Sequence, residues 1–221
     1  MNGDKRNDII TPQGWFEGPA DVRAAAEWTF HATDWMAPLP PGTPGVVAPP
    51  PAGAPSGPPP RPPEYAFMYV VDVNKDGRND VLTTMAHSYG VLWFEQGSGG
   101  EWVRHVIDVT WANSHSSAMA DLNGDGQLDL IAAKRYFGRN GVDPSEREPM
   151  GIYWYEFRPG ARGAVEWIRH IVDYGGRAGG GLQMVVQDID GDGDLDIVTG
   201  GKTGLFLFEN LTHVRAAGAA R

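Results

Sequence analysis

The chain contains no cysteine among its 221 residues. Disulfide bonds, thiolate metal sites and cysteine nucleophiles are therefore excluded, although this absence does not fix the compartment. No apolar run reaches the roughly 18 residues that a membrane-spanning helix requires, so we predict no membrane span. The first eight residues include no apolar segment of the kind found in signal peptides, and none is predicted for this chain.

Basic residues are outnumbered, with 18 Lys and Arg against 28 Asp and Glu, which gives a net charge of −10. Thirteen of the acids fall in four short stretches, and without them 15 acids stand against 18 bases. The acidity therefore belongs to a few loops. Because the rest is balanced in charge and 41% of the chain is hydrophobic, a disordered acidic chain is disfavoured. No basic cluster indicates nucleic-acid binding, so we expect no nucleic-acid partner.

A nine-residue acidic motif occurs three times, each time between two short apolar runs. An aromatic segment that ends in Glu follows each copy, and after two copies a further segment begins with Trp-x-Arg-His. Each unit therefore reads as four short strands, with the acidic loop between the first and the second. The copies begin at Asp72, Asp121 and Asp188, 49 and 67 residues apart, and four-stranded units at such spacing predict β-propeller blades.

The predicted fold class is therefore all-β. It is a β-propeller of about four four-stranded blades, two of them incomplete, which can form part of a seven-bladed ring. We expect a partial N-terminal blade at 1–35 that lacks its first strand, and a proline-rich loop at 36–64. Three blades with acidic loops are expected at 65–111, at 112–174 with a long loop at 134–150, and at 175–221 with a C-terminal tail.

The spacing D-x-[DN]-x-D-G-x-x-D predicts a calcium site, because side-chain oxygens at alternate positions of a tight loop can point inward together. Positions one, three, five and nine would supply side chains and position seven a backbone carbonyl, while Gly at position six permits a left-handed turn. Asp, Asn and Gly are also ordinary turn residues, but three copies in register favour metal binding. Several carboxylates favour calcium over magnesium. We predict up to three structural Ca²⁺ ions, held by Asp72, Asn74, Asp76, Arg78 and Asp80; by Asp121, Asn123, Asp125, Gln127 and Asp129; and by Asp188, Asp190, Asp192, Asp194 and Asp196.

A damaged fourth copy precedes these three. Asn2, Asp4 and Asp8 occupy positions three, five and nine, whereas Lys5 stands where the glycine belongs. We expect this loop to bind calcium weakly or not at all, because the first ligand is missing.

Polar residues also gather at the strand ends that lie opposite the acidic loops. In a propeller these ends surround the mouth of the central channel, where ligands commonly bind, and His and Arg suit hydroxyl-rich or carboxylate ligands. The alternative is that these residues only cap strands and meet solvent. The ligand-binding candidates are Tyr65, His87, Ser88 and Tyr89; Asn113, His115, Lys134 and Arg135; and Arg177, Gln183 and Lys202.

Other conspicuous side chains recur in register and favour structural roles. His105 and His170 each follow Trp-x-Arg in an expected outer strand, so we interpret them as structural and not as ligands. Trp93, Trp102, Trp154 and Trp167 are interpreted as packing between blades and not as sugar-binding platforms.

The acidic loop between strands, followed by an aromatic strand that ends in Phe-Glu-Asn, resembles the FG-GAP-like (VCBS-type) repeat of integrin α-subunit propellers and many bacterial exported proteins. The resemblance covers most of 66–210 and, more weakly, 2–31. It implies a calcium-stabilised propeller, usually of seven blades, that serves in binding in an extracellular or periplasmic setting. This sequence departs from the pattern in having about four blades, so it needs a partner or further blades to close a ring.

The sequence leaves three functions open. The first is a binding module for a carbohydrate or protein partner, with no enzymatic activity. The second follows from a resemblance of His87-Ser-Tyr-Gly90, Ser114-His-Ser116 and Lys134-Arg-Tyr136 to the propeller of aldos-2-ulose dehydratase-like proteins, which implies a metal-assisted lyase on keto-sugars. Its candidate catalytic residues are His87, His115 and Arg135. The third is a non-functional gene fragment of a larger propeller protein.

Overall fold

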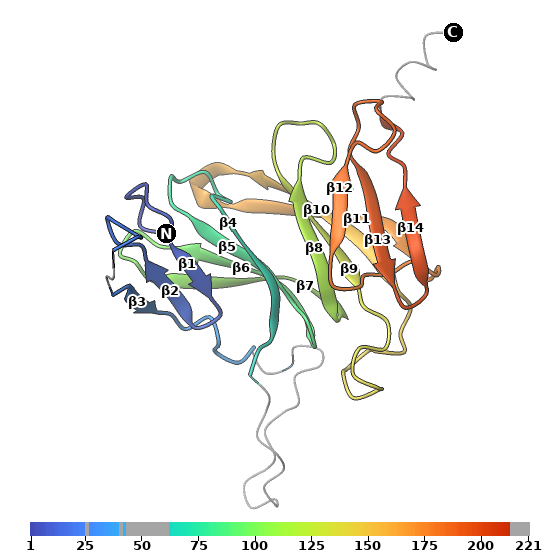
Figure 1. Ribbon diagram of the computed structural model, residues 1–221, viewed down its shortest axis with the longest axis horizontal. Coiled ribbons are helices and arrows are strands. Elements are labelled where there is room, and N and C mark those ends of the chain that lie inside the picture. Colours follow the sequence, from blue (N-terminus) through green and yellow to red (C-terminus); the bar gives the residue numbers. More distant parts are fainter. Residues whose placement is uncertain (25–26, 40–41, 43–61, 213–221) are drawn as a thin grey trace, which may run out of the picture. The chain divides into compact units, whose positions relative to one another are not determined.

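The computed structural model describes residues 1–24, 27–39, 42 and 62–212 (Figure 1). These residues form fourteen β-strands and one 3-10 turn, Ala161–Gly163, so the predicted all-β class is confirmed. The strands make four antiparallel sheets of three or four strands each, and the strand order within every sheet follows the chain. The chain divides into two compact units, Met1–Ala112 and Asn113–Arg221.

The first unit contains a three-stranded and a four-stranded sheet. The three-stranded sheet consists of β1 (Ile9–Thr11), β2 (Gly14–Glu17) and β3 (Thr29–Ala32). The four-stranded sheet consists of β4 (Tyr65–Val71), β5 (Asp80–Met85), β6 (Tyr89–Gln96) and β7 (Trp102–Ala112). The first acidic loop joins β4 to β5, as the repeat predicts.

The second unit repeats this plan with the incomplete sheet at its end. Its four-stranded sheet consists of β8 (Ser114–Ala120), β9 (Asp129–Lys134), β10 (Gly151–Pro159) and β11 (Val165–Tyr174). Its three-stranded sheet consists of β12 (Met184–Gln187), β13 (Asp196–Gly201) and β14 (Gly204–Phe208). The other two acidic loops join β8 to β9 and β12 to β13 (Figure 1).

The same registers recur because the same residue types recur. Val81 lies opposite Phe94 in the β5–β6 pair, and Ile197 lies opposite Phe208 in the β13–β14 pair. Each of these positions directly follows the last Asp of a loop or directly precedes the Glu that ends the aromatic strand. β-branched and aromatic residues at facing positions stabilise such hairpins.

The last residue of the expected N-terminal blade and the start of the expected proline-rich loop belong to the core of the first unit. Trp35 is fully buried and Leu39 nearly so, and both pack with Trp15, Val81 and Phe94. Apolar burial therefore fixes residues that the proline content of the segment obscured. The remainder of the proline-rich segment, 40–41 and 43–61, lies outside the described residues, as does the expected tail at 213–221.

Candidate functional site

In each of the three acidic loops the position-one carboxylate accepts two backbone N–H groups, from positions five and six in the first two loops and from positions four and six in the third. In the first loop the backbone N–H of Asp76 donates to Asp72 Oδ1 (3.0 Å) and the N–H of Gly77 donates to Asp72 Oδ2 (2.9 Å). The second loop repeats both bonds, from Asp125 and Gly126 to Asp121, at 3.0 and 2.8 Å. In the third loop Asp188 accepts from Gly191 and Gly193 at 2.7 and 3.1 Å. The carboxylate at position one therefore organises each turn.

Each loop contains two left-handed residues. The glycines at position six, Gly77, Gly126 and Gly193, have φ values of 87°, 87° and 95°, as expected for this position. Position four is also left-handed, with φ of 60° at Lys75, 73° at Gly124 and 82° at Gly191. We did not predict this second turn, although Gly at position four in two of the three motifs was a signal for it.

The Asp at position nine is buried in all three loops, at Asp80, Asp129 and Asp196. Its Oδ2 accepts the N–H of position two, at 3.2 Å from Val73, 3.0 Å from Leu122 and 2.9 Å from Ile189. In two loops the other oxygen accepts the N–H of the residue that follows the Glu of the aromatic segment, from Gln96 to Asp80 (2.9 Å) and from Asn210 to Asp196 (2.8 Å). Position nine therefore ties the loop to the sheet and keeps lone pairs for a cation.

The third loop brings its carboxylates together. One oxygen each from Asp188, Asp190 and Asp196 lies within 4.8 Å of the others, and the buried Oδ2 of Asp192 has no hydrogen-bond partner. In the second loop, burial raises the pKa of Asp129 to about 7, and repulsion from Asp125 and Asp121 adds to this shift. A divalent cation would bind the unpartnered oxygen of Asp192 in the third loop. It would also offset the repulsion between the carboxylates of the second loop, so both donor sets fit calcium.

The damaged first copy keeps two further bonds that all three complete loops make, from the N–H of position five to position three and from the N–H of position seven to position five. The N–H of Asp4 donates to Asn2 Oδ1 (3.2 Å), the N–H of Arg6 donates to Asp4 Oδ1 (2.9 Å), and Lys5 adopts φ of 66° at the glycine position. The side chain of Arg6 also donates to the Asp4 carboxylate, and this hydrogen bond lowers the pKa of Asp4. Arg78 pairs with Asp76 in the same way in the first complete loop, so this arginine pairing is not peculiar to the damaged copy.

A group of one Trp, one His and one Glu side chain recurs in three of the four sheets. His31, His105 and His170 stack on Trp15, Trp93 and Trp154, with ring centroids 4.0, 4.1 and 3.9 Å apart. Their Nε2 atoms lie 2.9, 2.7 and 3.3 Å from Oε2 of Glu17, Glu95 and Glu156. These side chains fix the outer strand to the aromatic strand, which supports the structural interpretation of His105 and His170.

The ligand-binding candidates of the first unit have partners within that unit. The hydroxyl of Tyr65 donates to the backbone carbonyl of Trp35, and burial raises the pKa of Tyr65 to about 12. His87 Nε2 lies 3.5 Å from Glu64 Oε2. Tyr89 begins β6 and is half-buried, next to the half-buried Ser88.

The candidates of the second unit divide into buried and accessible groups. Lys134 is 1% exposed, and its Nζ donates to the carbonyl (2.8 Å) and hydroxyl (2.6 Å) of Ser145. Burial lowers the pKa of Lys134. Asn113 is also buried and donates its Nδ2 to the Pro144 carbonyl (2.9 Å). Arg135 Nη1 lies 3.1 Å from His115 Nε2. Burial therefore leaves Arg135 as the more accessible cation of this group.

A cavity of 490 Å³ brings Arg135 together with Lys202. Glycine backbone forms much of its wall, because a Cβ at Gly181 would lie 2.3 Å from the Gly200 carbonyl and thus exclude a side chain. Arg177 and Gln183 are exposed on either side of this glycine segment but are not among the lining residues. The full lining is Arg135, Tyr136, Gly180, Gly181, Leu182, Gly200, Gly201, Lys202, Gly204 and Leu205.

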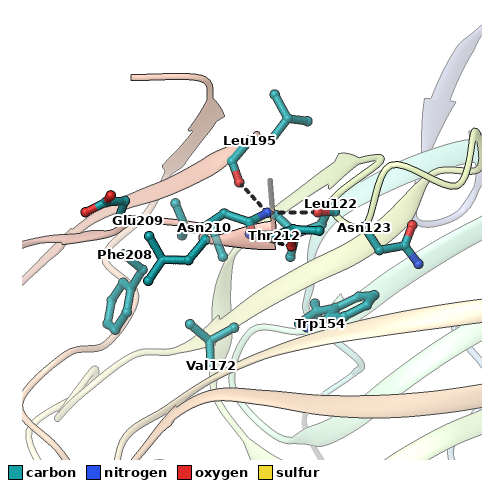
Figure 2. Close-up of a pocket in the computed structure, with 11 residues that line it drawn as sticks. Leu122, Asn123, Trp154, Val172, Leu195, Phe208, Glu209, Asn210 and Thr212 are labelled. Atoms are coloured by element: carbon teal, nitrogen blue, oxygen red, sulfur yellow. Dashed lines mark hydrogen bonds between the residues drawn. The ribbon is translucent and has the colours of Figure 1, made fainter. Parts of the chain in front are cut away.

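A second cavity of 360 Å³ lies between the two sheets of the second unit, beside their acidic loops. Asn210 crosses from one sheet to the other, since its Nδ2 donates to the carbonyls of Leu122 (3.0 Å) and Leu195 (3.3 Å). Figure 2 shows this amide with Trp154 and Val172 below it. This cavity cannot be read from the sequence, because it depends on how two sheets pack.

Successive antiparallel sheets with one acidic loop at the same hairpin define a β-repeat protein. Residues 72–132 match the family described as FG-GAP-like repeat, a span that begins at the first complete acidic loop and ends in β9. Residues 72–132 are thus similar to an FG-GAP-like repeat, as the motif indicated. No curated protein gives a significant match. In the described residues, no helix has the length and apolar character needed to cross a membrane.

Proposed function

We propose that this chain is a calcium-stabilised interaction module of the propeller type, which binds a protein or carbohydrate partner. The four sheets would be its blades, with further blades or a partner completing the ring. The observation that carries the proposal is that the position-one carboxylate organises all three acidic loops in the same way, and that in the third loop the carboxylates of Asp188, Asp190 and Asp196 converge. This arrangement places negative charges where only a cation makes their proximity favourable.

Calcium would be held by the side chains at positions one, three, five and nine and by the carbonyl at position seven. Asp188, Asp190, Asp192 and Asp196 form the most acidic of the three sets. Bound calcium would supply charge neutralisation and crosslink the strands on either side of each loop. The extracellular or periplasmic space suits this role, because calcium modules of moderate affinity function where the ion is abundant.

The cavity that contains Arg135 and Lys202 supports a ligand-binding face. Two cationic side chains beside glycine backbone suit a carboxylate or hydroxyl-rich group, since guanidinium and ammonium groups donate hydrogen bonds. His115 holds the Arg135 guanidinium from one side at 3.1 Å. An acidic saccharide or the carboxylate of a peptide matches this chemistry.

Thermal unfolding in calcium and in excess chelator tests the calcium role. At a calcium concentration about 100 times Kd, one site adds about 2.7 kcal/mol, which corresponds to a rise in Tm of about 5–10 °C for a chain of this size. We expect Asp188→Asn to reduce the rise, because position one is Asp in all three loops and its two carboxylate oxygens organise the turn around the ion. Asp190→Asn is the matched control, because the other two loops have Asn at position three. An unchanged Tm in chelator would contradict the calcium role.

Titration with glucuronate tests the ligand-binding face. Arg135→Gln should weaken binding about 10-fold or more, the loss of about 1.4 kcal/mol expected for one charged hydrogen bond. Arg162→Gln, at an exposed turn outside the cavity, is the control. Equal binding by both variants would place the ligand elsewhere.

A further inference from the structure

The cavity that contains Arg135 and Lys202 is cationic, although the chain has a net charge of −10. None of the described residues that line it is Asp or Glu. Arg135 Nη1 lies 3.1 Å from His115 Nε2, and a guanidinium has five N–H donors, so this contact does not exhaust it. The Nζ of Lys202 donates to the Phe137 carbonyl (2.5 Å), which holds the second cation in place. The cavity therefore favours an anionic ligand.

The other side chains that line the cavity are largely apolar and meet solvent. Tyr136, Leu182 and Leu205 are 41%, 63% and 77% exposed. Among the described lining residues, the Tyr136 hydroxyl is the one uncharged polar side-chain group. A saccharide would bring several hydroxyl groups to these side chains, and a hydroxyl that is buried without a hydrogen bond costs free energy. The lining therefore fits an apolar group beside the anion better than a hydroxyl-rich group.

A glycine on β13 leaves room for such an apolar group. Gly200 lies opposite Leu205 in the β13–β14 pair, and both line the cavity. Beyond its chain neighbours, a Cβ at Gly200 would have one heavy atom of the described residues within 4 Å, Cδ1 of Leu205 at 3.6 Å. The space above Gly200 is thus open, and a ligand group that enters it can pack against the Leu205 side chain.

We propose that this cavity binds a carboxylate that carries an apolar group, with the carboxylate on Arg135 and the apolar group over Gly200 against Leu205. A planar guanidinium can bond both oxygens of a carboxylate, and Lys202 adds a second positive charge. The volume of 490 Å³ suits a small ligand of this kind. The C-terminal residue of a peptide that ends in leucine has this chemistry, as does a free branched-chain acid.

This inference rests on the proposed function, because it names the ligand class of the proposed binding face. It decides between the acidic saccharide and the peptide carboxylate in favour of a carboxylate with an apolar neighbour. If glucuronate binds more tightly than an apolar carboxylate, the ligand class is wrong and the binding face stands. If neither binds, the binding face is also lost, while melting in chelator still tests the calcium role.

The probes are N-acetyl-leucine, its uncharged analogue N-acetyl-leucinamide, and N-acetylglycine, each titrated into the full chain in calcium and followed by NMR chemical shifts. N-acetyl-leucine should bind at least about 10-fold more tightly than the amide, a difference of about 1.4 kcal/mol, because only the acid pairs with the guanidinium. It should also bind about 10-fold more tightly than N-acetylglycine, because its side chain is removed from water. Equal binding of N-acetyl-leucine and either analogue would overturn the proposal.

Isocaproate separates the two sources of this chemistry, since it has the leucine side chain and the carboxylate but no amide group. Tighter binding of N-acetyl-leucine than of isocaproate supports a peptide C-terminus as the ligand. Equal binding of the two supports a free acid. Failure of both to bind more tightly than N-acetylglycine would overturn the proposal.

Two exposed leucines on one face of β14 give a matched pair of variants. Leu205→Ala should weaken N-acetyl-leucine binding about 5-fold, because Leu205 lines the cavity. Leu207→Ala should change it less than about 2-fold, because Leu207 is 56% exposed and is not among the lining residues. Equal effects of these two variants would overturn the proposal.

Two further variants test the carboxylate and the open space separately. Arg135→Gln should remove the preference for N-acetyl-leucine over its amide, and a preference that persists would contradict the role of Arg135. Gly200→Val should occupy the space beside Leu205 and lower the affinity for N-acetyl-leucine at least about 10-fold. Leu205→Ala alters an exposed side chain, so it tests the site even if Gly200→Val fails to fold.

Discussion

The imidazole ring of His105 stacks on the indole ring of Trp93, with centroids 4.1 Å apart and 19° between the planes. Glu95 connects this pair to the acidic loop. Its Oε2 lies 2.7 Å from His105 Nε2, and its Oε1 accepts a hydrogen bond from Asn74 Nδ2 (2.9 Å). A chain of contacts thus joins the outer strand of the sheet to position three of the acidic loop. The stability of the sheet and the shape of the loop are therefore coupled.

We expect His105→Ala to lower the free energy of unfolding by about 1–2 kcal/mol, because it removes both the stacking and the hydrogen bond to Glu95. His105→Phe keeps an aromatic ring and should lose about half as much. Urea unfolding in calcium measures both variants. Unchanged stability in His105→Ala would mean that the repeated histidines have a role other than packing.

Position nine and position three of the third loop should respond differently when calcium is absent. Asp196 accepts backbone N–H groups through both oxygens, so Asp196→Asn turns an amide donor toward a backbone donor and should cost about 1–3 kcal/mol in chelator. Asp190 is exposed, and Asp190→Asn should have little effect under the same conditions. Urea unfolding in chelator compares them, and equal losses would contradict the distinct anchoring role of Asp196.

We expect the folded protein to lose stability at alkaline pH as Tyr65 ionises. Its pKa is raised from 10.0 to about 12 by burial, so the unfolded chain releases the phenolic proton first as the pH rises. The contribution of Tyr65 to stability is therefore complete below pH 10 and is lost between pH 10 and about 12. Tyr65→Phe should remove this decline and cost about 1 kcal/mol at neutral pH through the lost bond to the Trp35 carbonyl. Parallel pH profiles of the two proteins would contradict the assignment.

The repeated features of the fold could be predicted because each of their sequence motifs occurs several times. The acidic motif fixed the position of the hairpins, and the aromatic strands ending in Glu fixed their partners. The burial of individual side chains was harder to predict from the sequence. β9, from Asp129 to Lys134, is buried along its whole length, so it has no alternation that would have indicated that Lys134 points inward. The burial of Trp35 and Leu39 was hidden by neighbouring prolines, since composition does not reveal which side chains a distant sheet covers.

Trp35 offers a direct test of how the inter-sheet space of the first unit is filled. Trp35→Ala should lower the free energy of unfolding by about 3–5 kcal/mol, because it removes a fully buried ring and leaves a cavity. Phe30→Ala, at a side chain that is 44% exposed on β3, is the control and should cost much less. Free indole should raise the Tm of Trp35→Ala and leave Phe30→Ala unchanged, because only the first variant has an apolar cavity of the right shape. If indole stabilises neither variant, the neighbouring side chains have collapsed into the space, and the inter-sheet cores are more plastic than their repeated composition indicates.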